Sequence, residues 1–206
     1  MSRPRSPSAK SLSAGLRGLL ASRKQHLSVR EIVDRFSGEN GLGPVLFVLT
    51  LPVVIPLPPG MSMVLALPLL VVAPQIVAGR KELWLPRWLG ARTLDHEPLD
   101  KLIRRIMPWL KRVEAMGKPR LPALTGALGT RAVGVAATVL ALILVLPIPF
   151  ANLFPSLALG LFALGLTRRD GLMVIGGYVL LALAAGIIDL GAHGVMMIVH
   201  RLEGVV

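Results

Sequence analysis

Two long apolar runs, each interrupted near its middle by prolines, constrain this chain more than any other feature. The first extends from Gly43 to Gly79 and the second from Ala132 to Leu166, and neither contains Asp, Glu, Lys, Arg or His. Each run is about 35 residues long, whereas one helical crossing of a bilayer needs about 20 residues. Because proline removes a backbone donor and blocks a continuous helix, each run predicts a helix, a break and a second helix in lipid.

The rest of the chain completes the prediction of an all-α integral membrane protein with a single membrane domain. Ser11 to Lys24 is a basic amphipathic segment that lies either on a membrane surface or packed on the domain. Ser28 and Glu31 form a capping box, which marks the start of a helix. The predicted organisation is a basic N-terminal segment (1–27), repeat 1 (28–79), a basic interfacial linker (80–118), repeat 2 (119–170) and a last membrane helix (172–199).

The two breaks hold the candidate contacts for a transported substrate. The first arm, Gly43 to about Ile55, would be roughly 20 Å long as a helix, which is shorter than a hydrocarbon core of about 30 Å. Non-helical backbone at that depth survives only where protein or water covers it. The sequence therefore leaves a full hairpin and a re-entrant loop equally open. The candidate pathway residues at the breaks are Pro56, Pro58, Gly60, Ser62, Pro147, Pro149 and Asn152.

Few side chains in the apolar segments are able to do chemistry. Asn152 would face either an ion or headgroup, or the loose carbonyls of its own turn. Asp189 and His193 are spaced i, i+4, so they share a helix face, either as a proton relay or as a hydrated pair at the outer interface. No metal site, cofactor site or catalytic motif is recognisable. The sequence therefore predicts a protein that is not an enzyme.

The charge distribution predicts a multi-pass membrane protein whose basic loops lie in the cytoplasm. Net charge is +12, with eight Lys or Arg in the first 40 residues, twelve between Arg80 and Arg131, and two in the turn 167–171. Basic loops remain in the cytoplasm, so the N-terminus is expected there and each broken run should enter and leave on that side. Nucleic-acid binding is not expected, because the chain has no recognition motif and only nine aromatic residues.

The linker has the composition of a membrane interface. Two tryptophans stand beside basic residues near its start, and from Leu99 a helical apolar stripe carries its basic residues on the other faces. Anionic lipid headgroups are the expected partners. The predicted interface residues are Trp84, Arg87, Trp88, Lys101, Arg104, Arg105, Lys111 and Arg112.

The two runs also superpose on each other at an offset of 91 residues. Gly43 then falls on Gly134, Pro56 on Pro147 and Pro58 on Pro149. Transporters often contain such repeats, with their broken helices meeting near the bilayer midplane. The pattern indicates either an internal duplication or two unrelated hairpins that need similar turns.

Several short motifs resemble the ExoD family over roughly residues 28–200. The resemblance implies a small bacterial inner-membrane protein linked to exopolysaccharide synthesis and alkaline tolerance, and it implies no particular reaction. The segments that carry it are Leu51-Pro52, Pro56 to Ser62, Trp84-Leu85-Pro86, Arg120-Leu121-Pro122 with Leu124-Thr125-Gly126, Leu146 to Asn152, and Arg169-Asp170-Gly171.

Three functions are compatible with these features. The first is a small transporter or channel, for ions and pH homeostasis, with the breaks lining its pathway; it would need a homodimer, since five short helices enclose little space. The second is a non-transporting accessory of the exopolysaccharide machinery, whose basic face holds a partner or anionic lipid. The third is a flippase for a lipid carrier.

Overall fold

A computed structural model describes residues 12–21, 26–37, 42–54, 61–80, 83–116, 120–146 and 152–203. These residues are mostly helical, as the sequence predicts, and α8 and α10 each contain a segment long and apolar enough to cross a membrane. The elements are α1 (Leu12–Leu20), β1 (His26–Ser28), α2 (Val29–Phe36), α3 (Gly43–Val54), α4 (Met61–Val77), α5 (Arg87–Gly90), β2 (Thr93–Asp95), α6 (His96–Met116), α7 (Pro122–Thr125), α8 (Ala127–Val145), α9 (Leu153–Arg168) and α10 (Gly171–Glu203).

The predicted arms of both apolar runs are present as helices. The arms expected from Gly43 to about Ile55 and from Met61 to Gly79 are α3 and α4, and the second run forms α8 and α9. The breaks themselves lie outside the described residues. This applies to the candidates Pro56, Pro58, Gly60, Pro147 and Pro149, and to the side chain of Ser62.

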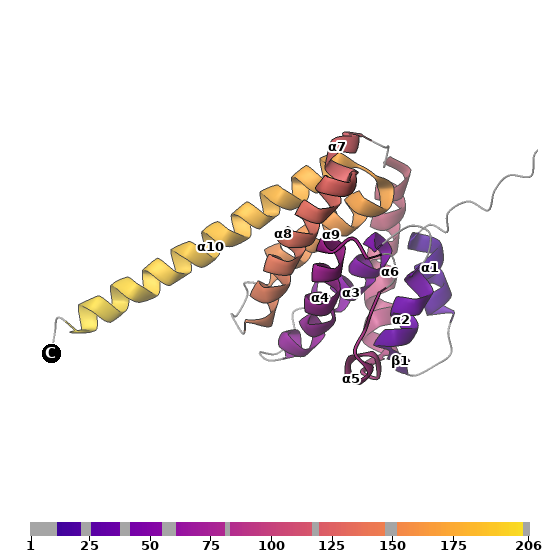
Figure 1. Cartoon of the computed structure of the whole chain (residues 1–206). Coiled ribbons are helices and arrows are strands. Elements are labelled where there is room, and N and C mark those ends of the chain that lie inside the picture. The colour runs from indigo at the N-terminus through magenta and orange to yellow at the C-terminus, as the bar shows by residue number, and fades with distance from the viewer. Residues whose placement is uncertain are drawn as a thin grey trace, which may run out of the picture.

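The four arms pack as two antiparallel pairs, α3 with α9 and α4 with α8, and α10 lies against α9 (Figure 1). Glycines allow the close approach of each pair. A Cβ at Gly43, the start of α3, would lie 2.6 Å from Thr167 Oγ1 near the end of α9. A Cβ at Gly134 of α8 would lie 2.7 Å from the backbone nitrogen of Val77, the end of α4. The helix ends that flank the two breaks therefore all lie at one end of this bundle, which we call the break end.

The N-terminal helices pack on the domain. Leu12, Leu16 and Leu19 of α1 are buried, and α1 contacts α6. Of the two placements that the sequence left open for this segment, the structure has the packed one. The predicted capping box is confirmed, because Ser28 Oγ accepts the Glu31 N–H at 3.1 Å and Glu31 Oε2 accepts the Ser28 N–H at 3.2 Å.

The linker is bound to the domain at several points that the sequence did not predict. β1 and β2 form a short antiparallel pair with Leu27 opposite Leu94. Gln75, buried in α4, donates to the carbonyl oxygen of Trp84 and accepts the Trp84 N–H, both at 2.8 Å. Arg30 of α2 donates to the carbonyl oxygen of Leu85 at 2.9 Å. Gln75 therefore holds α4 to the linker through backbone hydrogen bonds.

The long amphipathic helix α6 runs lengthwise along the bundle. Leu102, in the first half of α6, lines the same cavity as Ser156 near the start of α9. Glu114, near the end of α6, accepts a hydrogen bond through its carbonyl oxygen from Arg168 Nη2 at the end of α9, at 3.0 Å. The predicted apolar stripe is confirmed, since Ile103 and Leu110 are buried. The basic residues of α6 are consequently distributed along one flank of the molecule, from one end of the bundle to the other.

Candidate functional site

Asn152 is the one predicted pathway residue at the breaks whose side chain the structure describes. It precedes α9 at the break end, yet its side chain makes no capping hydrogen bond there. Its carboxamide oxygen is buried and has no hydrogen-bond partner among the described residues. A buried polar atom without a partner costs free energy, so this oxygen is available to accept a hydrogen bond or to coordinate a cation.

Asp189 and His193 share one face of α10, as their spacing predicted. His193 Nδ1 lies 3.4 Å from Asp189 Oδ1 and 3.0 Å from the Asp189 carbonyl oxygen. Both side chains are more than 70% exposed. Within the described part of the chain, no group of three His, Cys, Asp or Glu side chains is placed to hold a metal ion. The pair therefore lies on an exposed face of α10.

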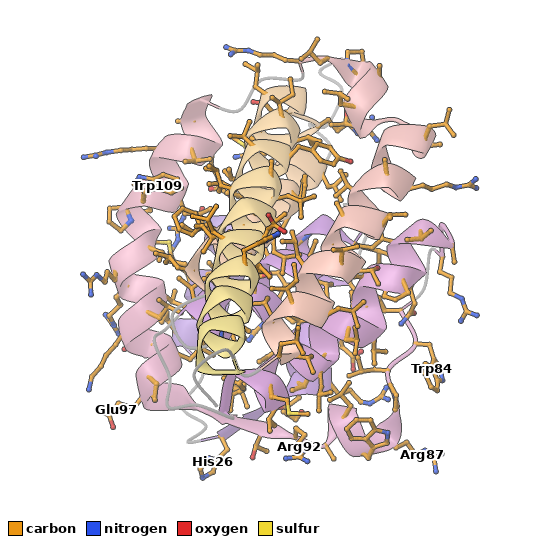
Figure 2. All side chains as sticks on the ribbon, turned by 90° about the vertical axis from the view of Figure 1, so that its left-hand side faces the viewer. His26, Trp84, Arg87, Arg92, Glu97 and Trp109 are labelled. Atoms are coloured by element: carbon orange, nitrogen blue, oxygen red, sulfur yellow. The ribbon has the colours of Figure 1, made fainter. Side chains whose placement is uncertain are left out.

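The predicted interface residues occupy two regions. Figure 2 shows Trp84 and Arg87 at the lower end of the molecule, together with His26, Arg92 and Glu97. The indoles of Trp84 and Trp88 are exposed, which suits an interfacial position. The second region is the exposed flank of α6, which carries the other five: Lys101, Arg104, Arg105, Lys111 and Arg112.

Carboxylates one helical turn away neutralise two of the α6 cations. Lys101 Nζ lies 2.6 Å from Glu97 Oε1, and Arg104 Nε lies 2.7 Å from Asp100 Oδ2. The hydrogen bond from Lys101 lowers the pKa of Glu97, and the hydrogen bond to Asp100 raises the pKa of Arg104. Arg105 and Arg112 form no ion pair with any residue that the structure describes. Their charges therefore remain uncompensated on this flank.

An apolar cavity of about 340 Å³ opens between α3, α6, α9 and α10. Its two hydroxyl groups are already satisfied within their own helices, because Thr50 Oγ1 donates to the Leu46 carbonyl oxygen and Ser156 Oγ to that of Leu153. The sequence gives no sign of this cavity, because its walls come from four separate segments. The lining residues are Phe47, Thr50, Leu51, Val54, Leu102, Ile106, Trp109, Leu110, Ser156, Leu157, Gly160, Leu161, Leu164 and Leu180.

Two of the family motifs meet at the opposite end of the bundle. The Gly171 N–H donates to the Arg120 carbonyl oxygen at 2.8 Å, and Asp170 is buried and accepts the Leu172 N–H at 3.0 Å, which caps α10. Leu121 and Arg169 are the described non-glycine residues with positive φ, at 51° and 54°. Such conformations persist only where the surrounding structure enforces them. This motif junction, Arg120–Pro122 against Arg169–Gly171, is therefore a closely fitted part of the fold.

The predominantly helical fold, the two long apolar helices and the exposed tryptophans define a membrane-associated helical protein. A family model described as "Exopolysaccharide synthesis, ExoD" matches residues 12–189. The chain belongs to the ExoD family, as its motifs predicted, and is thereby associated with exopolysaccharide synthesis.

Two relatives are similar to most of the chain. Protein ExoD of Rhizobium meliloti is 35% identical over 177 residues, which cover 83% of this chain and 73% of the relative. The uncharacterized protein slr1875 of Synechocystis sp. is 34% identical over 143 residues, which cover 68% of each chain. No solved structure matches the chain.

Proposed function

We propose that this protein transports a substrate across the bacterial inner membrane in support of exopolysaccharide synthesis. The observation that carries the proposal is the convergence of four helix ends at the break end, where the Asn152 carboxamide oxygen is buried without a partner among the described residues. Interrupted helices that meet in a bundle are where transporters form their sites. An ion linked to pH homeostasis is the first candidate substrate, because carbonyls freed at helix breaks suit cations.

We propose that the two hairpins are an internal duplication, and the features that favour it also favour a transport pathway. At the offset of 91 residues, the end of α3 at Val54 falls on the end of α8 at Val145. The glycine contacts are equivalent as well. Gly43 contacts Thr167 and Gly134 contacts Ile76. Gly134 is the equivalent of Gly43, and Thr167 is the equivalent of Ile76, at this same offset. Two hairpins packed reciprocally in this way have the arrangement expected of repeats that enclose a shared pathway.

The proposed topology places the N-terminus and both hairpin bases in the cytoplasm and makes the protein multi-pass. α10 extends beyond the bundle (Figure 1), and along it Leu183, Ile187 and Leu190 are exposed. An apolar helix of this kind is stable in lipid. The basic residues at the hairpin bases, Arg131, Arg168 and Arg169, support this orientation.

Cysteine labelling tests this topology without background, because the chain contains no cysteine. Leu128, at the start of α8, and Leu153, at the start of α9, are both exposed. A membrane-impermeant maleimide is expected to leave Leu128→Cys unlabelled in intact spheroplasts. The same reagent is expected to label it fully in inverted vesicles. Rapid labelling of Leu128→Cys from outside would reverse the orientation. Slow labelling of Leu153→Cys that changes with pH indicates a re-entrant break, and fast labelling indicates a full hairpin.

Replacing Asn152 by alanine tests the transport function. The variant is tested in a strain whose exopolysaccharide production depends on this protein. Exopolysaccharide production is expected to fall to that of a strain lacking the protein, while the amount of the variant in the membrane equals that of the parent. In proteoliposomes with an enclosed pH-sensitive dye, the variant is expected to lose ion-dependent pH changes that the parent shows.

Thr138→Ala provides the matched control, because Thr138 Oγ1 donates a hydrogen bond within its own helix, to the Gly134 carbonyl oxygen. The strain that carries this variant is expected to produce as much exopolysaccharide as the parent strain. If Asn152→Ala sustains full exopolysaccharide production, Asn152 lies on no transport pathway. The accessory function, in which the basic flank of α6 binds a partner of the exopolysaccharide machinery, then becomes the better explanation.

A further inference from the structure

We infer that the apolar cavity beside α6 is a binding groove for one acyl chain of an anionic glycerophospholipid, with Arg105 and Arg112 holding the headgroup at its rim. This inference goes beyond the proposed transport function and does not depend on it. It assigns a ligand of defined chemistry to a site that lies on the flank of the bundle.

The interior of the groove suits a hydrocarbon chain. At about 340 Å³, it lies at the small end of ligand-binding pockets. Its walls are almost entirely aliphatic and aromatic, and the hydroxyls of Thr50 and Ser156 are occupied by their own helices. A polar ligand would lose its hydrogen bonds to water there without replacement, whereas an acyl chain loses none.

Lipid has access to the groove from the membrane. One wall includes Leu180 of α10, which lies within a segment long and apolar enough to cross a bilayer. Leu157 of α9 also lines the groove and is exposed. A chain lying between α6 and α10 would therefore leave the bilayer without passing through water.

The rim carries positive charge on the side that faces the groove. Trp109 lines the groove while remaining 60% exposed, so it stands at the mouth. Figure 2 shows Trp109 on α6 at the flank of the molecule. Arg105 precedes Trp109 by four residues and Arg112 follows it by three, which places all three on one side of α6. Both arginines are exposed and have no ion pair among the described residues. Guanidinium groups bind phosphate oxygens in a bidentate manner, and Trp109 belongs at the same headgroup level.

Gly160 shows that the groove is open space. It lines the groove, and a Cβ at this position would have no neighbour within 4 Å. A larger side chain here would occupy the space of the acyl chain without disturbing the packing of the helices. Gly186, on α10 and outside the groove lining, is equally open and provides the matched control.

Fluorescence quenching of Trp109 tests the inference in the full-length protein. Trp84→Phe and Trp88→Phe remove the other two tryptophans, whose indoles are exposed. The protein is reconstituted in phosphatidylcholine vesicles that contain a fixed minor fraction of brominated phosphatidylglycerol or, alternatively, brominated phosphatidylcholine. We expect phosphatidylglycerol to quench Trp109 more strongly, with association tighter by about fivefold for each arginine that meets the headgroup.

The variants separate groove binding from general surface attraction. Gly160→Leu is expected to abolish the preference for phosphatidylglycerol, and Gly186→Leu to retain it. Arg105→Gln with Arg112→Gln is expected to abolish it, whereas Arg104→Gln with Lys111→Gln, which removes two charges from the other side of α6, retains it. Equal quenching by the two lipids in the parent, or equal effects of the two charge pairs, would overturn the inference. Should Gly160→Leu fail to fold, the two arginine comparisons still decide the result.

Discussion

Replacing Gly171 by valine is expected to prevent accumulation of the folded protein. A Cβ at this position would lie 2.6 Å from Leu121 Cβ, 2.9 Å from the Leu121 carbonyl oxygen and 3.0 Å from that of Arg120. Two of these atoms belong to the backbone, so no side-chain rotation relieves the contact. Overpacking usually lowers the free energy of unfolding by about 1–3 kcal/mol. Because this contact is with rigid backbone, we expect a loss of about 3 kcal/mol or more, which is a large part of the stability of a typical domain.

The measurement for Gly171→Val is the yield of monodisperse protein after extraction in mild detergent, followed by its thermal unfolding midpoint. Gly186→Val is the control, because it places the same side chain on the same helix where no atom lies within 4 Å. If the two variants unfold at the same temperature, the motif junction does not have the close fit described above.

Valine at Gly134 is expected to separate α4 from α8. A Cβ there would lie 2.7 Å from the Val77 backbone nitrogen and 3.1 Å from the Ile76 carbonyl carbon. Helices of membrane proteins associate closely through small residues of this kind. The equivalent change, Gly43→Val, should separate α3 from α9 by the same mechanism. Each is expected to lower stability by about 2–4 kcal/mol.

Thermal unfolding of the purified variants in detergent measures these effects, with Gly160→Ala as the control at an open position of α9. Similar losses for Gly43→Val and Gly134→Val are expected if the two hairpins are packed reciprocally. A parental midpoint for either variant would contradict the close approach of that helix pair. A large loss at one position and none at the other would contradict the equivalence of the two hairpins.

Local features of the sequence predicted the helical arms well. The arm starting at Gly43 was predicted to end near Ile55 and ends at Val54, and the second was predicted to start at Met61, as it does. The capping box of Ser28 and Glu31 is also present. Each of these features depends on neighbouring residues only, since prolines end helices and a side chain three residues away completes the cap.

The candidate site was only partly predictable. Asn152 was identified because it is polar beside a break, but the burial of its oxygen without a partner among the described residues is a property of the tertiary structure. Trp109 and Gly160 were not identified, because neither is unusual within its own helix. They become neighbours of one cavity only when α6 lies along α3 and α9.

The sequence by itself determined the helical membrane-associated class, the limits of the arms and the family. These follow from apolar segment length, proline positions and short motifs, which are properties of contiguous residues. Only the tertiary structure decided that α6 lies lengthwise on the bundle and that Arg120–Pro122 meets Arg169–Gly171. It also decided that an apolar groove opens beside two arginines with no ion pair among the described residues. Contacts between segments far apart in the chain depend on how whole helices fit together, and hydrophobic periodicity does not specify which helix covers which face.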